Sequence, residues 1–206
     1  STYQDFFFFF FLMIRRPPSS TLFPYTTLFR STLIEPDDSD NLLPYSEDRT
    51  NAGWGNANIT VTDDGTTIAG LSASKMTFGS GGNTFSDNVG SVVGDYVTLS
   101  AFVARGDADD HGAGHRFGFY DNTAGADVGY ITFNYGTGTT SVQSGTVLTH
   151  GSVELSDGWL IYMTSAHTTG NTLTSYFGAV GADAGTGYFY LAGPKVDPKP
   201  YVSSYL

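Results

Sequence analysis

The stretch from Asp107 to His115 concentrates the side chains that most resemble metal ligands in this 206-residue chain. His111 and His115 are four residues apart, a spacing that would place both imidazoles on one face of a helix, with carboxylates just before them. Gly112 and Gly114 make a helix unfavourable there, and the stretch separates two segments with strand character. We therefore expect a surface loop rather than a metal site, and we expect the protein to hold no metal and no other cofactor.

Hydrolysis of a polysaccharide would need two carboxylates held across a cleft, one of them with a raised pKa. Nearly all of the acidic residues instead lie in glycine-rich turns or in the stretch over residues 32–58, where water keeps carboxylates ionised. Glu154 lies near a strand-like segment but has no evident partner, and no G-x-S-x-G motif marks a nucleophilic serine. The Glu35–Asp40 run invites a calcium interpretation, but without loop-specific ligand spacing it is predicted to be a solvated linker. The sequence therefore predicts a protein that is not an enzyme.

The composition favours β-strands and excludes several classes of partner. Glycine is abundant at 26 residues, and many Thr, Ser, Tyr and Val accompany few Lys, Glu and Leu. A formal net charge of −11 repels phosphate, so neither nucleic acid nor an anionic membrane is an expected partner. The chain has no cysteine, which excludes disulfides and thiolate metal sites. Packing alone must therefore stabilise the fold.

Residues 1–31 look like a non-native, adapter-derived segment. Thr21–Ser31 reads TLFPYTTLFRS, which matches residue for residue the in-frame translation of a short-read sequencing adapter, and Phe6–Phe11 reads as a translated homopolymer. The apolar run has about the length of a signal-peptide core, but Asp5 precedes it and Arg15 and Arg16 follow it, the reverse of a secretory signal. It is also far shorter than the roughly 20 residues that span a bilayer. We therefore expect residues 1–31 to be unstructured or artefactual, and we expect no membrane insertion.

From Ile59 onward, short runs of alternating polarity are separated by turn signals, a pattern typical of an antiparallel β-sandwich. Glycine-rich turns such as Gly79–Gly82 and Gly136–Gly138 tolerate positive φ, and no segment shows a sustained helical period. The predicted organisation is an extended lead-in over residues 32–58 and an all-β sandwich module over residues 59–206. The expected strands are Ile59–Thr62, Ala73–Phe78, Val97–Ala104, Arg116–Tyr120, Gly129–Tyr135, Thr140–Ser144, Trp159–Thr164, Thr174–Val180 and Tyr188–Ala192.

The strands Arg116–Tyr120 and Gly129–Tyr135 are joined by a loop short enough for an antiparallel hairpin. Period-2 alternation then directs Phe117, Phe119, Ile131, Phe133 and Tyr135 inward. Flat tyrosine rings, directional hydrogen-bonding groups and room above Gly118 would suit a sugar on the outer face, although an ordinary amphipathic solvent face is the alternative. The predicted ligand-binding residues of this face are Arg116, Tyr120, Tyr130, Thr132 and Asn134, joined by Gln143 if Thr140–Ser144 continues the meander.

The two tryptophans lead to different predictions. Trp159 begins a strand that carries Ile161 and Met163 on the same side, so a place in the core is expected. Trp54 lies between two glycines in a predicted loop, which makes it a further candidate for ligand binding, with packing at the sandwich edge as the alternative.

Several segments, in order along the chain, resemble lectin-like β-sandwich modules of tailed-phage fibre, spike and other virion proteins. The resemblance covers nearly everything from Asn41 to the C-terminal residue. It is carried by Asn41–Asp48 (NLLPYSED), Thr50–Trp54 (TNAGW), Asp157–Leu160 (DGWL), Gly187–Val196 (GYFYLAGPKV) and Pro200–Leu206 (PYVSSYL). The chain departs from the family pattern at Arg49, which replaces Phe, at Leu160-Ile161, which replaces Tyr-Arg, and at Lys195–Asp197, which replaces Gln-Leu-Glu.

The resemblance implies a jelly-roll sandwich related to carbohydrate-binding modules, located in the phage virion as part of a tail fibre or another appendage. Its implied partners are a host-surface polysaccharide or glycan and other virion subunits, with a homotrimer as one arrangement. Two alternatives stay open at this point. The module could serve a purely structural or oligomerisation role in a virion protein, or it could be an accessory carbohydrate-binding domain of a secreted enzyme.

Overall fold

The computed structural model describes residues 41–43, 46–86, 96–107, 115–167, 172–179 and 187–203. The chain divides into two compact units, residues 1–36 and 37–206, and all of the described residues belong to the second unit. The adapter-like segment over residues 1–31 and the acidic run from Glu35 to Asp40 therefore lie outside the described residues.

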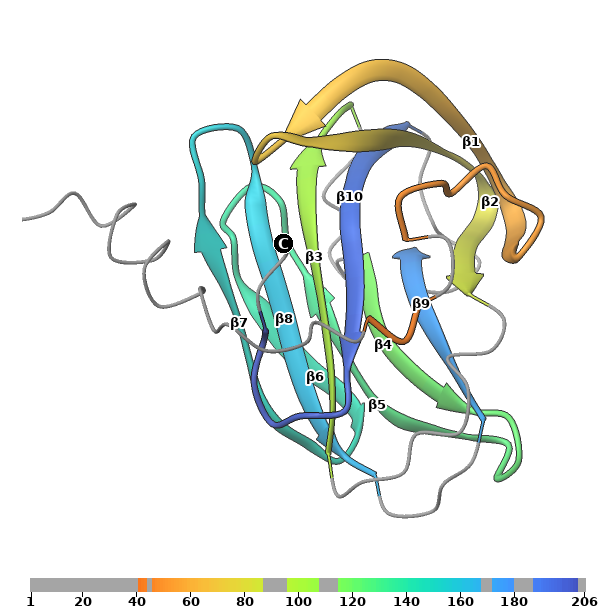
Figure 1. Ribbon diagram of the computed structural model, residues 1–206, viewed down its shortest axis with the longest axis vertical. Helices are drawn as coiled ribbons and strands as arrows, with labels where there is room; N and C mark the ends of the chain where they lie inside the picture. The colour runs from red at the N-terminus through yellow and green to blue at the C-terminus, as the bar shows by residue number, and fades with distance from the viewer. Residues whose placement is uncertain are drawn as a thin grey trace, which may run out of the picture. The chain divides into compact units, whose positions relative to one another are not determined.

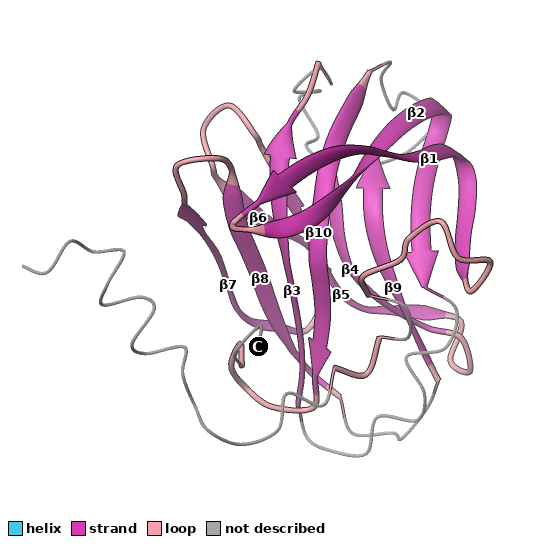
Figure 2. Cartoon of the chain, turned by 45° about the horizontal axis from the view of Figure 1, so that its top comes forward, coloured by secondary structure: helices cyan, strands magenta, loops and turns pink. Residues whose placement is uncertain are grey.

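Ten strands account for the regular structure of the described residues, which contain no helix (Figure 2). Accordingly, none of the described segments forms a helix with the length and apolar character needed to cross a bilayer. The all-β prediction is confirmed. The strands are β1 (Trp54–Ile68), β2 (Leu71–Ser86), β3 (Tyr96–Arg105), β4 (His115–Asp121), β5 (Ala126–Phe133), β6 (Thr140–Gly145), β7 (Val147–Glu154), β8 (Trp159–Ala166), β9 (Leu173–Ala179) and β10 (Tyr188–Asp197).

The strands form two antiparallel sheets that pack as a sandwich (Figure 1). One sheet has the order β7-β8-β3-β10-β2-β1 and the other the order β9-β4-β5-β6. Strand β2 takes part in both sheets, because Ala73–Thr77 pair with β10 and Asn83–Ser86 pair with β9. In Figure 1 the long β1–β2 hairpin arches over the top of the sandwich. The two sheets are therefore continuous through β2, while the jelly-roll connectivity implied by the resemblance stays a prediction.

The core follows from the alternation of side chains along the strands. Alternate residues of β3, from Val97 to Val103, are at most 2 % exposed, as the alternation of side chains along a strand requires. The inward set predicted for the β4–β5 hairpin is also buried, with Tyr135 the most exposed member at 6 %. Each such side chain contributes about 1.5–3 kcal/mol when it is fully buried. Other members of the core include Met76, Leu99, Met163, Phe177, Phe189 and Leu191.

The outer face of β3 is covered as well. Thr98, Ser100 and Phe102 alternate with the core residues and are all buried. The Thr98 hydroxyl lies 2.8 Å from the Thr164 hydroxyl and donates to the Lys199 carbonyl oxygen at 2.6 Å. The segment after β10 therefore contacts the back of the sheet and excludes water from it.

A polar cluster at the end of β10 is fully enclosed. Lys195, Asp197 and Ser203 are each at most 5 % exposed. The Lys195 ammonium donates to the Ser203 hydroxyl at 2.6 Å, and that hydroxyl donates to a carboxylate oxygen of Asp197 at 2.5 Å. Burial lowers the pKa of Lys195, and the charge of Asp197 partly opposes that shift. The cluster ties residue 203 back to β10.

The described part of the predicted lead-in is integral to the sandwich, which corrects the boundary at residue 59. Leu43 is 3 % exposed within the core, and β1 begins at Trp54 rather than at Ile59. The backbone N–H of Leu42 donates to the carbonyl oxygen of Val196 at 3.0 Å. The predicted start of the sandwich was placed too late because the sequence before Ile59 shows no regular alternation. Single side chains of this segment, such as those of Leu43 and Trp54, nevertheless pack into the core.

Arg49, which replaces the Phe of the resembling family, is also buried at 1 % exposure. Its guanidinium donates to the Ser74 hydroxyl and to the Ser72 carbonyl oxygen, both at 3.0 Å, and to the carbonyl oxygen of Ser46. Burial lowers the pKa of Arg49 to about 10, and the nearby carboxylates, Asp63 first, oppose that shift. The buried cation thus satisfies its donors on two residues of β2 and on the carbonyl oxygen of Ser46.

Strand β7 was not predicted from the sequence. Its burial pattern shows no alternation, because most of its residues are half-buried or exposed along an edge of the sheet. His150-Gly151 also interrupts the apolar sequence in its middle. A Cβ at Gly151 would lie 2.7 Å from the hydroxyl oxygen of Tyr162, its neighbour across the ladder, but that hydroxyl is the end of a side chain that can move aside. An edge strand of this kind carries little periodic signal.

Candidate ligand-binding face

Three adjacent strands, β5, β4 and β9, position the aromatic side chains of the candidate site. Gly118 on β4 pairs with Tyr130 on β5 and with Tyr176 on β9. Since Phe117 and Phe119 point into the core, the residues alternating with them point outward. Tyr130 and Tyr176 therefore flank Gly118 on the outer face of the sheet.

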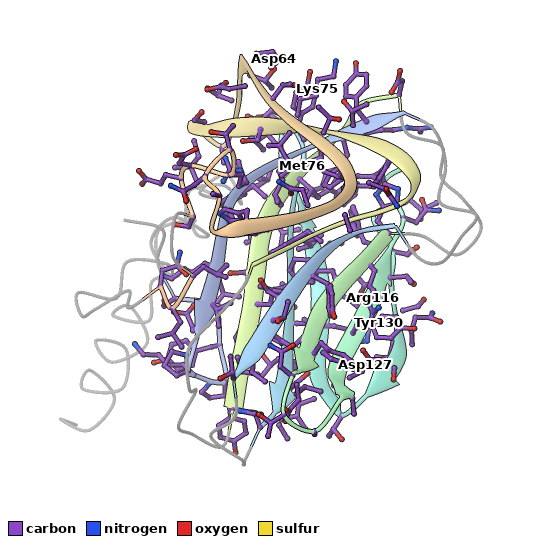
Figure 3. All side chains as sticks on the ribbon, turned by 90° about the vertical axis from the view of Figure 1, so that its right-hand side faces the viewer. Asp64, Lys75, Met76, Arg116, Asp127 and Tyr130 are labelled. Atoms are coloured by element: carbon purple, nitrogen blue, oxygen red, sulfur yellow. The ribbon has the colours of Figure 1, made fainter. Side chains whose placement is uncertain are left out.

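Arg116 lies between these two rings. Its guanidinium carbon is 4.1 Å from the ring centroid of Tyr130 and 4.6 Å from that of Tyr176. Nη2 of the same guanidinium forms an ion pair with Asp127 at the start of β5. Figure 3 shows Arg116, Tyr130 and Asp127 gathered on this face of the sandwich. Two cation–π contacts and a charge-assisted hydrogen bond hold the arginine in one geometry.

Tyr120 completes a surface that we call the tyrosine face, defined as Tyr120, Tyr130 and Tyr176 around Arg116, with Asp127. The ring of Tyr120 packs edge-on against that of Tyr176, with 6.0 Å between centroids and an interplanar angle of 73°. All three tyrosines are half-buried, so each ring keeps part of its surface open to solvent. Burial raises the pKa of the Tyr176 hydroxyl, and the charge of Arg116 partly offsets this. That hydroxyl therefore stays protonated at neutral pH and can donate.

The room above Gly118 that was predicted to admit a sugar ring is filled. Gly118 is buried, and the Arg116 guanidinium lies between the two rings that flank it. A Cβ at Gly118 would lie 2.5 Å from the Cα of Tyr130 and closer still to the Gly129 carbonyl oxygen. The glycine thus permits a close approach of β4 to β5 rather than an opening, and a ligand would contact the rims of the tyrosine rings.

Thr132 and Gln143 belong to the margin of this face. The Gln143 amide donates to the Thr132 hydroxyl at 3.3 Å, which joins β6 to β5. Thr132 is 8 % exposed and offers little surface to a ligand, whereas Gln143 is exposed. Gln143 is therefore the predicted margin residue with the most accessible polar group.

Asn134 is part of a turn and not of the sugar-facing strand that was predicted. Strand β5 ends at Phe133, and the Asn134 side-chain oxygen accepts the backbone N–H groups of Gly136 and Thr137, each at 2.9 Å. An asparagine that bonds backbone groups two and three residues ahead stabilises a turn. Its acceptor is therefore already used within the protein.

Trp54 is a core residue, which corrects its prediction as a ligand-binding candidate. It is 3 % exposed, begins β1, and packs against Phe177 with 6.1 Å between ring centroids. The glycines on either side suggested a loop, but Gly55 already belongs to the strand. A ring buried to this extent cannot stack on a ligand without unfolding the strand around it.

The sequence prediction missed Tyr176 and Asp127. Tyr176 lies between the buried Ser175 and Phe177, so its outward direction was readable from the sequence. The pairing of β9 with β4, however, joins residues that are 52 to 64 positions apart, from Asp121 with Leu173 to His115 with Ala179. Asp127 had been assigned to the hairpin loop, whereas a β-bulge beside Tyr120 brings it into the ladder. Neither long-range pairing nor a bulge leaves a pattern in the local sequence.

His115 does not lie in a surface loop. It begins β4 and is 5 % exposed, with its ring edge-on to those of Tyr135, Phe78 and Phe189 at 4.7, 5.0 and 5.5 Å. His111 lies outside the described residues, and Asp107 accepts the backbone N–H of Tyr188 at 2.8 Å. Among the described residues, no group of three or more His, Cys, Asp or Glu is arranged to hold a metal ion.

The tyrosine face offers aromatic edges, hydroxyl groups and guanidinium donors, while its carboxylate is engaged by Arg116. The Nε atom of Arg116 is buried and makes no hydrogen bond within the described structure. Such an arrangement is suited to binding a polar ligand with apolar faces. A scan against protein-family models gives no match to the chain, and a search of curated proteins gives no significant match either.

Proposed function

We propose that residues 41–206 form a non-catalytic module of a tailed-phage virion protein, in a tail fibre or another appendage, that binds a host-surface glycan through the tyrosine face. The observation that supports binding is the arrangement of Tyr120, Tyr130 and Tyr176 around an arginine fixed by Asp127. Side chains already held in place lose little conformational entropy when a ligand binds.

The assignment to virion proteins rests on the sequence resemblance, and the packing of the resembling segments is consistent with it. The Asn41 amide, in the opening segment, donates to the Pro194 carbonyl oxygen at 3.1 Å, and its side-chain oxygen accepts the Val196 N–H at 3.0 Å. The opening and closing segments therefore contact each other directly. Asp157, in the third segment, accepts the backbone N–H of Ala69 at 2.9 Å and holds the β1–β2 turn.

The chemistry of the tyrosine face favours a neutral glycan. Arg116 is the only Lys or Arg within the ranges of β4, β5, β6 and β9, and Asp127 neutralises it. The net charge of −11 adds a repulsion toward uronic or sialic acids. A neutral pyranose can instead place its C–H groups against the rims of the tyrosine rings and its hydroxyls against the tyrosine and Gln143 polar groups.

Affinity for one sugar at such a face is expected to be weak. Each net hydrogen bond contributes about 0.5–1.5 kcal/mol, and an open face excludes little water. Several copies on one virion would raise the effective affinity by avidity, as is general for linked weak sites. A weak single site is therefore compatible with firm attachment to a polysaccharide surface.

The test is binding of the protein to a glycan array and to purified bacterial surface polysaccharides, followed by Tyr120→Ala and Tyr130→Ala. We expect each variant to lose about tenfold in affinity, corresponding to about 1.4 kcal/mol for a lost ring contact. Tyr96→Ala is the matched control, because Tyr96 is 40 % exposed on β3 and lies outside the tyrosine face. Equal binding by the wild type and by both folded variants would place the glycan site elsewhere.

A structural role in the virion is the second candidate function, and a specific observation favours it. Val142 on β6 and Leu148 on β7 are 45 % and 48 % exposed, which gives the sandwich an apolar edge that a glycan does not require. Absence of binding to any glycan, together with specific self-association, would support this role. An accessory domain of a secreted enzyme would be recognised by a catalytic domain in the same reading frame.

A further inference from the structure

One side of the sandwich is built from a long uncharged run of strand sequence, bordered by Asp127 near the start of β5 and by Glu154 at the end of β7. The sequence from Val128 to Val153 contains no Asp, Glu, Lys or Arg, and β8 contains none either. This sequence covers most of β5 and β7 and all of β6. The chain has 20 acidic and 9 basic residues, so a run of this length without any charged residue sets these strands apart from the rest of the sequence.

Strands β6 and β7 are the terminal strands of the hydrogen-bonded order, and side chains join them to each other. The Thr140 hydroxyl lies 2.7 Å from His150 Nδ1, and the Ser152 hydroxyl donates to the Gly138 carbonyl oxygen. Val142 on β6 and Leu148 on β7 each lie two residues along their strand from the contact between Thr140 and His150. We call Val142 and Leu148 the apolar edge; β7 forms the left-hand margin of the sandwich in Figure 1.

We propose that the apolar edge is a docking surface for a second copy of this chain, related to the first by a two-fold axis. A two-fold contact brings the same patch from both copies together, so a charged patch would repel itself and an uncharged one would not. The acidic residues Asp63 and Asp64 lie on β1, at the opposite end of the same sheet from β7. The charge distribution therefore favours approach of two copies through the β6–β7 side.

The contact is made by side chains rather than by continuing either sheet. The β7–β8 ladder shifts register between Val147 and Thr149, which places Leu148 in an irregularity, and the β5–β6 ladder shifts beside Gln143. Such bulges interrupt the row of backbone groups that an added strand would need. Two valines and two leucines at a dimer axis form a small contact, so the dimer is expected to dissociate in the micromolar range.

The experiment measures self-association of the full chain by sedimentation at about 1–300 µM. We expect a monomer–dimer equilibrium that Leu148→Asp and Val142→Asp each weaken at least about tenfold, because both place like charges across the axis. Tyr201→Asp adds the same charge at a residue 46 % exposed outside the apolar edge and should leave the equilibrium unchanged. A monomer at every concentration overturns the proposal, as does association that neither edge variant alters.

A second measurement does not depend on the folding of the charged variants. The chain has no cysteine, so Leu148→Cys introduces a single thiol. Under mild oxidation, two thiols near a two-fold axis should form a covalent dimer faster than those of Tyr201→Cys at equal concentration. Equal rates for the two variants would show that the apolar edge does not lie at the contact between copies. Docking of a different protein at this edge would give a monomer in both experiments and also overturns the proposal.

Discussion

Replacing Gly118 by alanine tests whether the close approach of β4 to β5 sets the geometry of the tyrosine face. The added Cβ would lie 2.5 Å from the Cα of Tyr130, and its other near neighbours include the backbone of Gly129. Backbone cannot rotate away, so the strands must separate. Inserting a methyl group into a site without room lowers the free energy of unfolding by about 2–3 kcal/mol. For a domain of this size, each kcal/mol lowers the thermal midpoint by about 2–4 °C.

The assay is urea unfolding with linear extrapolation, and Gly151→Ala is the matched control. Gly151 is also a strand glycine with a close neighbour, but that neighbour is the hydroxyl end of Tyr162, which can rotate away. We expect the control to change stability by no more than about 0.5 kcal/mol. If Gly118→Ala loses no more stability than Gly151→Ala, the close approach is not a constraint, and the account of Arg116 stacked above it is wrong.

Three further predictions concern other parts of the chain. Lys195→Met should lower the free energy of unfolding by about 3–5 kcal/mol, because it leaves Asp197 buried without its cation. The double variant Lys195→Met with Asp197→Leu should be more stable than the single variant, and urea unfolding measures both. The pKa of Tyr176 is raised in the folded state, so its contribution to the free energy of unfolding should be fully present below pH 10.0 and be lost as the pH rises above that value. The free energy of unfolding should therefore change less between pH 9 and pH 11 in Tyr176→Phe than in the wild type. Deletion of residues 1–31 should improve solubility and leave the thermal midpoint unchanged, and a fall of more than a few degrees would contradict their assignment as non-native.

Local alternation predicted the parts of the fold in which one strand face is apolar. It placed Val97–Val103 and the β4–β5 hairpin correctly, because a period of two is imposed directly by the pleat. It failed at β7, where an edge strand has no buried face, and at Arg49, whose burial depends on acceptors more than twenty residues away on β2.

The candidate site was predictable only in part, for a related reason. Arg116, Tyr120 and Tyr130 lie on two strands joined by a short loop, so their shared face followed from local sequence. Tyr176 arrives from β9, and the choice of β9 as the neighbour of β4 is made by tertiary packing. Trp54 was misjudged because its flanking glycines suggested a turn, whereas the strand simply passes through Gly55.

The strand order has a consequence for how the domain is made on the ribosome. Strands β9 and β10 are the last two in sequence, yet β9 lies between β4 and β2, and β10 lies between β2 and β3. Until residues 173–197 have emerged, the earlier strands expose unpaired edges where these two belong. Neither sheet can therefore be completed before those residues emerge, and a chain that stops before Leu173 would release two open sheet edges into the cell rather than a smaller folded unit.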